Sequence, residues 1–123
     1  MYEGMKDALS VLHSRLPTPP IWAAYRRVGS FIYFDMGERV EVTSPQRPSR
    51  YVGKLILVVH LCHWKLFDDD KEVLNSYCED DNIYETVFSN LIEQQITKIK
   101  KVNTTTIRIS FSKSSRRRYR LYL

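Results

Sequence analysis

A run of apolar residues from Leu55 to Leu66 constrains the fold of this chain more than any other segment. Six of the seven residues from Leu55 to Leu61 are apolar, and His60 is the exception. Residues that are apolar at odd and even positions alike need cover on both faces of a sheet. The run is shorter than the roughly 20 residues that cross a bilayer. We therefore predict that it forms the central strand of one sheet.

The composition predicts a single domain over residues 1–123. Of its 123 residues, 43% are hydrophobic and 12% aromatic, enough for a core of its own. The first residues lack the basic and apolar pattern of a signal peptide, and no stretch is long enough for a membrane helix, so we expect a soluble, cytoplasmic protein. The formal net charge of +5 favours an anionic partner.

Two amphipathic helices are predicted, one at the start of the chain and one in its second half. The first spans residues 3–16, where apolar residues recur at helical spacing before three prolines end it. The second begins at Asn82, whose spacing from Glu85 matches a capping box. It continues through Leu91 and Ile92 with a clear apolar stripe.

Strands are predicted on both sides of the second helix. Before it, we expect strands at 27–35, 39–43 and 71–78 and allow for a short one at 21–25, with a turn at Gly37 and a loop at 44–50. After it, a three-stranded meander is expected at 96–102, 105–112 and 116–123. This order predicts an α+β fold, a mostly antiparallel sheet of about five to seven strands with two helices packed on one face.

The meander is the candidate binding surface. Period-two alternation places basic side chains on one face and apolar side chains on the other. The predicted partner-binding residues are Lys98, Lys100, Arg108, Arg116, Arg118 and Arg120. Neighbouring cations sum to a positive field, and arginine pairs bidentately with carboxylate or phosphate. The alternative is a solvated face that keeps an edge strand from pairing with other chains.

Nucleic acid is another class of partner for this face. Binding of single strands would need exposed aromatic side chains among the cations, and Tyr122 is the one aromatic residue predicted there. An acidic protein surface fits the same charges without that requirement.

Histidine and cysteine residues near the end of the apolar run raise the question of catalysis. His60 and His63, with Lys65, would suit acid–base cleavage of RNA in a small hydrolase. His60, Cys62 and Cys78 match no common zinc spacing. We therefore predict no catalytic residue, no metal and no cofactor, and leave open whether His60, Cys62 and His63 do more than pack.

Several features follow one another in a definite order: Val28-Gly-Ser-Phe31, Asp35-Met-Gly37, a strand ending in Cys62-His-Trp64, a helix, and the meander from Ile96 to Leu123. This order resembles small bacterial immunity proteins encoded beside polymorphic or contact-dependent growth-inhibition toxins. The resemblance implies a non-enzymatic cytoplasmic protein that binds one cognate toxin domain and blocks its active or substrate-binding surface. It carries over no binding residues.

The sign of the charge restricts that interpretation. Many toxin nucleases are basic, so a basic inhibitor implies an acidic face on this toxin. Otherwise the inhibitor would use its own acidic clusters, Asp68 to Asp70 and Glu79 to Asp81. The identity of the toxin and the choice between monomer and dimer stay open at this point.

Overall fold

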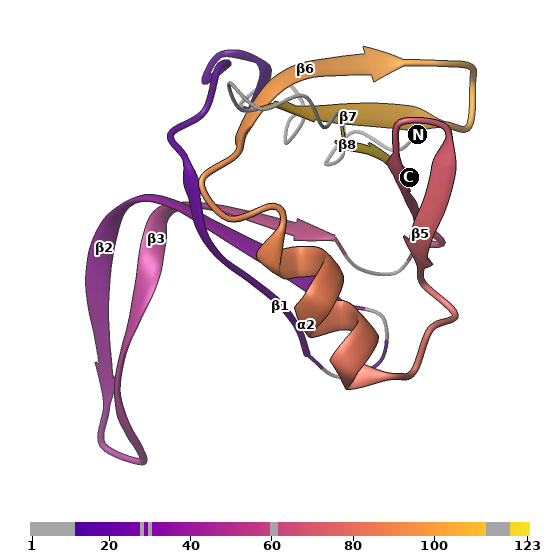
Figure 1. Cartoon of the computed structure of the whole chain (residues 1–123). Coiled ribbons are helices and arrows are strands. Elements are labelled where there is room, and N and C mark those ends of the chain that lie inside the picture. Colours follow the sequence, from indigo (N-terminus) through magenta and orange to yellow (C-terminus); the bar gives the residue numbers. More distant parts are fainter. Residues whose placement is uncertain (1–11, 28, 30, 60–61, 113–118) are drawn as a thin grey trace.

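In the computed structural model, the residues that the structure describes form two antiparallel sheets and one short helix (Figure 1). The structure describes residues 12–27, 29, 31–59, 62–112 and 119–123. These residues form eight strands and one helix, so the predicted α+β fold with two helices packed on a single sheet is wrong. Of the predicted first helix, residues 3–11 lie outside the described residues, and Leu12 and His13 are helical.

The first sheet has the strand order β1-β2-β3. Its strands are β1 (Ile21–Arg26), β2 (Ile32–Ser44) and β3 (Arg47–Val59). The short strand β1 pairs with β2 between Ile32 and Met36, whereas β2 and β3 continue together well past that point. In Figure 1 they project from the body as a long hairpin, where the sequence predicted two shorter strands and a loop at 44–50.

The apolar run from Leu55 to Leu66 is not a central strand. Strand β3 ends at Val59 at the edge of the first sheet, and the second sheet begins with β4 (Lys65–Asp68). The run has apolar residues at odd and even positions, as predicted, but one of its two faces in β3 is not covered. Val59 is buried, whereas Ile56 and Val58, on the opposite face of β3, remain 41% and 40% exposed.

The second sheet has the strand order β5-β4-β8-β7-β6. Its other strands are β5 (Lys71–Asn75), β6 (Gln95–Lys101), β7 (Ile107–Ser112) and β8 (Tyr119–Tyr122). The antiparallel β6-β7-β8 meander and the return strand β5 confirm the predictions for those segments. The pairing of β4 with β8 joins the β4–β5 hairpin to the meander and brings together strands far apart in sequence.

Aromatic side chains connect the two sheets and the helix in one core. Phe34 of β2 lies 5.7 Å, between ring centroids, from both Phe88 of the helix and Phe111 of β7. The helix, α2 (Asp81–Ser89), packs against β1 and presents Tyr84 and Phe88, four residues apart, on its buried face. Within the described residues, no helix is both long and apolar enough to span a membrane.

The start of α2 is set by Asp80 and not by Asn82, the predicted N-cap. The Asp80 carboxylate accepts a hydrogen bond of 2.9 Å from the backbone N–H of Asn82. Asp80 has extended backbone geometry, as an N-cap residue requires. The prediction was wrong by two residues because Asp80, Asp81 and Asn82 are all suitable capping residues.

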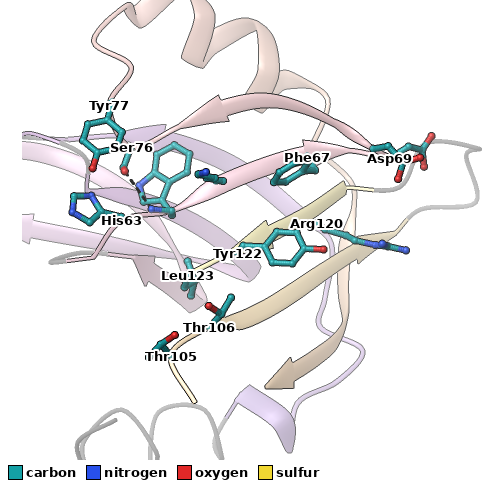
Figure 2. Close-up of a pocket in the computed structure, with 13 residues that line it drawn as sticks. His63, Phe67, Asp69, Ser76, Tyr77, Thr105, Thr106, Arg120, Tyr122 and Leu123 are labelled. Carbon is teal, nitrogen blue, oxygen red and sulfur yellow. Dashed lines mark hydrogen bonds between the residues drawn. The ribbon is translucent and has the colours of Figure 1, made fainter. Parts of the chain in front are cut away.

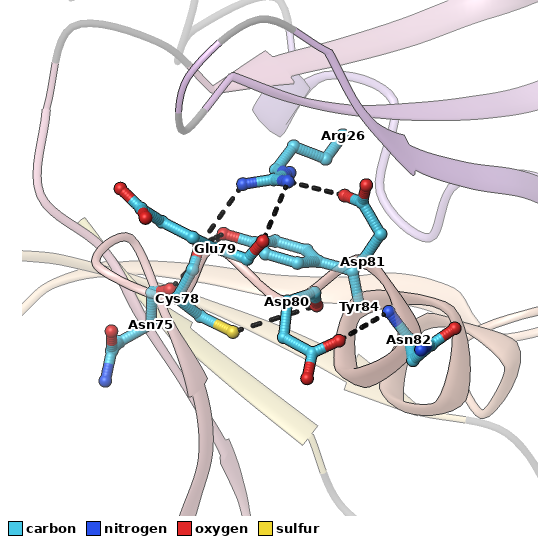
Figure 3. Close-up of polar contacts among 8 residues, drawn as sticks. All are labelled: Arg26, Asn75, Cys78, Glu79, Asp80, Asp81, Asn82 and Tyr84. Carbon is cyan, nitrogen blue, oxygen red and sulfur yellow. Dashed lines mark hydrogen bonds and ion pairs between the residues drawn. The ribbon is translucent and has the colours of Figure 1, made fainter.

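Arg26 ties β1 to the segment that leads into α2 (Figure 3). Its guanidinium donates to the carbonyl oxygens of Cys78 and Glu79, at 3.3 and 3.4 Å, and pairs with the Asp81 carboxylate. The same group lies 4.5 Å from the ring centroid of Tyr84, a cation–π contact. One side chain therefore fixes the first sheet against the helix.

Candidate functional site

The outer face of the five-stranded sheet, which points away from the core, carries the basic residues predicted to bind a partner. Strand register places Lys100 opposite Arg108, and Arg108 opposite Tyr122. Two residues further along each strand, on the same face, Lys98 lies opposite Ser110, and Ser110 lies opposite Arg120. The alternate residues of β7 and β8 are buried: Ile107, Ile109, Phe111, Tyr119 and Leu121.

Four of the six predicted contact residues therefore lie on one face. Lys98 and Lys100 are exposed, and Arg108 and Arg120 are half-buried. The other two, Arg116 and Arg118, lie outside the described residues.

A β-bulge lies in β6, where strict alternation would place Ile96 on the same face as Lys98 and Lys100. Register shifts between Ile96 and Lys98, so that Thr97 is the extra residue on β6. As a result, Ile96 and Ile99 are both buried, although they are three residues apart. The shift places Lys98 and Lys100 on the same face as Arg108 and Arg120.

A groove of about 620 Å³ lies on the β4–β8 side of the outer face (Figure 2). Across it, Lys65 of β4 pairs in register with Tyr122, and Phe67 pairs with Arg120. The rings of Phe67 and Tyr122 meet edge to face, with centroids 5.3 Å apart.

Different chemistry marks the two ends of the groove. At one end the His63 ring stacks on Tyr77 with a centroid separation of 5.1 Å. At the other end Figure 2 shows Arg120 and Asp69, and Asp70 also lines the groove. Aromatic rings and charges of both signs are therefore available to one ligand.

The electrostatics of the outer face favour a partner with carboxylates. Lys65 lies 3.8 Å from Glu72, but this pair is largely exposed and holds Lys65 weakly. The Arg108 Nε atom is buried and has no hydrogen-bond partner among the described residues. Lys98 and Lys100 are exposed on this face, so their ammonium groups are accessible to the carboxylates of a partner.

Of the aromatic residues that line the groove, the sequence predicted Tyr122 on the basic face but not Phe67 or Tyr77. Phe67 and Tyr77 were assigned to a strand end and a return strand, with no indication that they would lie beside the basic meander. Their approach depends on the β4–β8 pairing, which joins distant segments. The local signal was present in Phe67, which alternates with the buried Leu66 and must therefore face outward.

Of the histidine and cysteine residues that the sequence analysis singled out, Cys62, His63 and Cys78 belong to the described residues. Cys62 and Cys78 are half-buried free thiols, and burial raises the pKa of the Cys62 thiol, which favours its neutral form. Across the described ranges, no three His, Cys, Asp or Glu side chains are grouped so that they could hold a metal ion. His63 and Lys65 both line the groove, but His60 lies outside the described residues.

No protein-family model, curated protein or solved structure matches the chain. The function of the outer face must therefore be argued from its own geometry. That geometry offers cations for carboxylates or phosphates, rings for apolar or planar groups, and hydroxyl groups from Ser76, Thr105 and Thr106.

Proposed function

We propose that this protein is a non-enzymatic, cytoplasmic inhibitor that binds a partner protein through the outer face of the five-stranded sheet. The partner would be a bacterial toxin domain with an acidic surface, and binding would block its active or substrate-binding surface. The observation that supports this proposal most strongly is the position of Lys100, Arg108 and Arg120 on one face, next to an aromatic groove.

The composition of the groove favours a protein over a nucleic acid. Tyrosine and arginine dominate the energetics of protein interfaces, and both line this groove together with Phe67. Asp69 and Asp70 would repel the phosphates of a nucleic acid strand that followed the groove. A folded protein can present carboxylates to Arg120 and donors to these aspartates at the same time.

The choice of a toxin as the partner is based on the sequence resemblance to immunity proteins. In the structure the helix and the meander follow the apolar run along the chain, as they do in the layout on which the resemblance was based. The apolar run itself is divided between two sheets, which that layout did not include. The binding surface is argued from the structure, and the class of partner from the sequence.

Single-stranded nucleic acid is the second candidate, and a specific observation favours it. Phe67 and Tyr122 lie among cations on a sheet surface, the combination that stacks bases while it neutralises phosphates. This candidate predicts binding of a fluorescent oligonucleotide with an affinity that falls steeply as salt is raised.

Affinity capture with matched charge reversals tests the proposal. Tagged protein is used as bait in extracts of its own bacterium, with and without nuclease. The proposal predicts one stoichiometric acidic protein that survives nuclease. Lys100→Glu combined with Arg120→Glu should weaken its binding at least about tenfold, since contacts between like charges cost several kcal/mol.

Lys101→Glu is the control for Lys100→Glu alone, because both single variants change the net charge by the same amount. Lys101 belongs to the same strand and is exposed, but it alternates with Lys100 and lies on the opposite face of the sheet. The Lys101→Glu variant should bind the partner as the wild type does. Equal losses of affinity from changes on the two faces would contradict the assigned surface. Capture of mixed nucleic acid that nuclease removes would favour the second candidate.

A further inference from the structure

The β2–β3 hairpin carries a second surface, independent of the groove. Strand β3 lies at the edge of the first sheet over its whole length. In the part of the chain that the structure describes, no strand pairs with its outer side. An unpaired strand edge exposes alternate backbone N–H and C=O groups that can accept one more strand. Figure 1 shows the hairpin standing clear of the rest of the molecule.

One face of this hairpin is apolar along most of its length. Register places Val40 opposite Val52 and Val42 opposite Arg50, and the even-numbered residues of β3 continue the same face. The apolar residues of this face that are well exposed are Val40 (41%), Val42 (39%), Ile56 (41%) and Val58 (40%). Apolar side chains that stay exposed along an edge strand are well placed to pack against the side chains of an added strand.

The charges of β3 specify what that strand should carry. From Arg47 to Val59, β3 contains basic residues and no acidic residue. Arg50 and Lys54 lie on the apolar face itself, among its valine and isoleucine side chains. Lys54 lies 3.8 Å from Glu38, but the two side chains are 72% and 74% exposed, so this pair is weak and can exchange partners.

The same charges disfavour a second copy of this chain at the edge. If two β3 strands paired antiparallel about Val52, Arg50 of each copy would face Lys54 of the other. Like charges directly opposite each other destabilise a strand pair. Pro48, which lacks a backbone N–H, further limits pairing near the tip of the hairpin.

We propose that the free edge of β3, from Arg50 to Val58, binds an extended acidic segment of another protein as a fourth strand of the sheet. The segment carries carboxylates opposite Arg50 and Lys54. It carries β-branched side chains opposite Val52, Ile56 and Val58. Backbone hydrogen bonds hold the segment, and the alternation of acidic and apolar residues selects it.

Peptide binding to the full chain tests this proposal by fluorescence anisotropy. The probe is a short fluorescein-labelled peptide in which threonine alternates with glutamate and valine in the matching order. The first comparison peptide has lysine in place of each glutamate, and the second is N-methylated at alternate backbone nitrogens. We expect the glutamate peptide to bind at least about tenfold more tightly than the lysine peptide, and N-methylation to abolish binding because it removes the edge hydrogen bonds.

Variants of the protein locate the binding site. Arg50→Glu combined with Lys54→Glu should reverse the preference between the glutamate and lysine peptides, whereas Lys101→Glu should leave it unchanged. Absence of binding, equal binding of both peptides, or unchanged binding of the N-methylated peptide overturns the proposal. Sedimentation velocity tests the other occupant, since a dimer that the double variant disrupts would assign the edge to a second copy.

Discussion

Replacing Gly53 by alanine should destabilise the protein for a steric reason. A Cβ atom at position 53 would lie 2.4 Å from the backbone nitrogen and 2.6 Å from the carbonyl oxygen of Met36 on the paired strand. Both contacts are far inside van der Waals distance, and backbone atoms of a paired strand cannot rotate away. The Gly53 N–H also donates to the buried Asp35 carboxyl group at 3.0 Å. Strands β2 and β3 would have to separate at the base of the hairpin.

The magnitude follows from these contacts. Overpacking of a tight site costs about 1–3 kcal/mol, and a buried acceptor left without its donor costs about 1–3 kcal/mol more. Alanine restricts the unfolded chain and returns about 0.4–1 kcal/mol. The net loss is about 3 kcal/mol, which for a chain of this size lowers Tm by about 10 °C.

Urea denaturation followed by circular dichroism measures this loss, and Gly29→Ala is the control. Gly29 has a left-handed backbone, with φ of 67°, but a Cβ atom there would meet nothing within 4 Å. Its replacement should cost about 1 kcal/mol, from backbone strain alone. If Gly53→Ala unfolds at the same urea concentration as Gly29→Ala or the wild type, the steric account of the hairpin base is refuted.

Three smaller predictions concern single contacts. Arg26→Ala should lower the free energy of unfolding by about 2 kcal/mol in urea titration, because two backbone carbonyls and the Tyr84 ring lose the guanidinium; Arg26→Lys should recover little of this. Asp80→Ala should cost about 1 kcal/mol and Asp80→Asn much less, since asparagine can still cap α2. In a Cys78→Ser background, the alkylation rate of Cys62 should rise with pH at a higher pH than for a free cysteine peptide, because burial raises its thiol pKa; coincident pH profiles would contradict this.

Sequence patterns predicted the parts of the fold that depend on local alternation. The segments around Ile107 to Phe111 and Tyr119 to Leu121 alternate strictly, and both are strands of the predicted meander with the predicted faces. The irregular phase of β6 was also visible in the sequence. Its cause, a bulge at Thr97, became clear from the register with β7.

Gly37 shows why the long hairpin could not be predicted. A glycine within a strand pattern can end the strand or form a bulge in it. The sequence favoured a turn, but Gly37 has φ of 75° at a shift in register between β2 and β3, and β2 continues beyond it. The distinction depends on the partner strand, and Gly53 of that strand leaves room for the bend.

The sequence predicted only the part of the candidate site that depends on neighbouring strands of the meander. Lys98, Lys100, Arg108 and Arg120 share a face because neighbouring strands of a meander pair with each other. The groove needs β4 beside β8, a pairing of segments far apart in sequence that alternation does not encode. Assigning Leu55 to Leu66 to one central strand concealed that β4 begins a second sheet.

Oxidative side-chain footprinting of the complex with the captured partner protein tests the central claim most directly. If the outer face binds the partner, Phe67 and Tyr122 should lose reactivity in the complex, while Ile83, 44% exposed on α2, should react as in the free protein. If Phe67 and Tyr122 stay as reactive as in the free protein while the partner is bound, the outer face of the five-stranded sheet is not the binding surface.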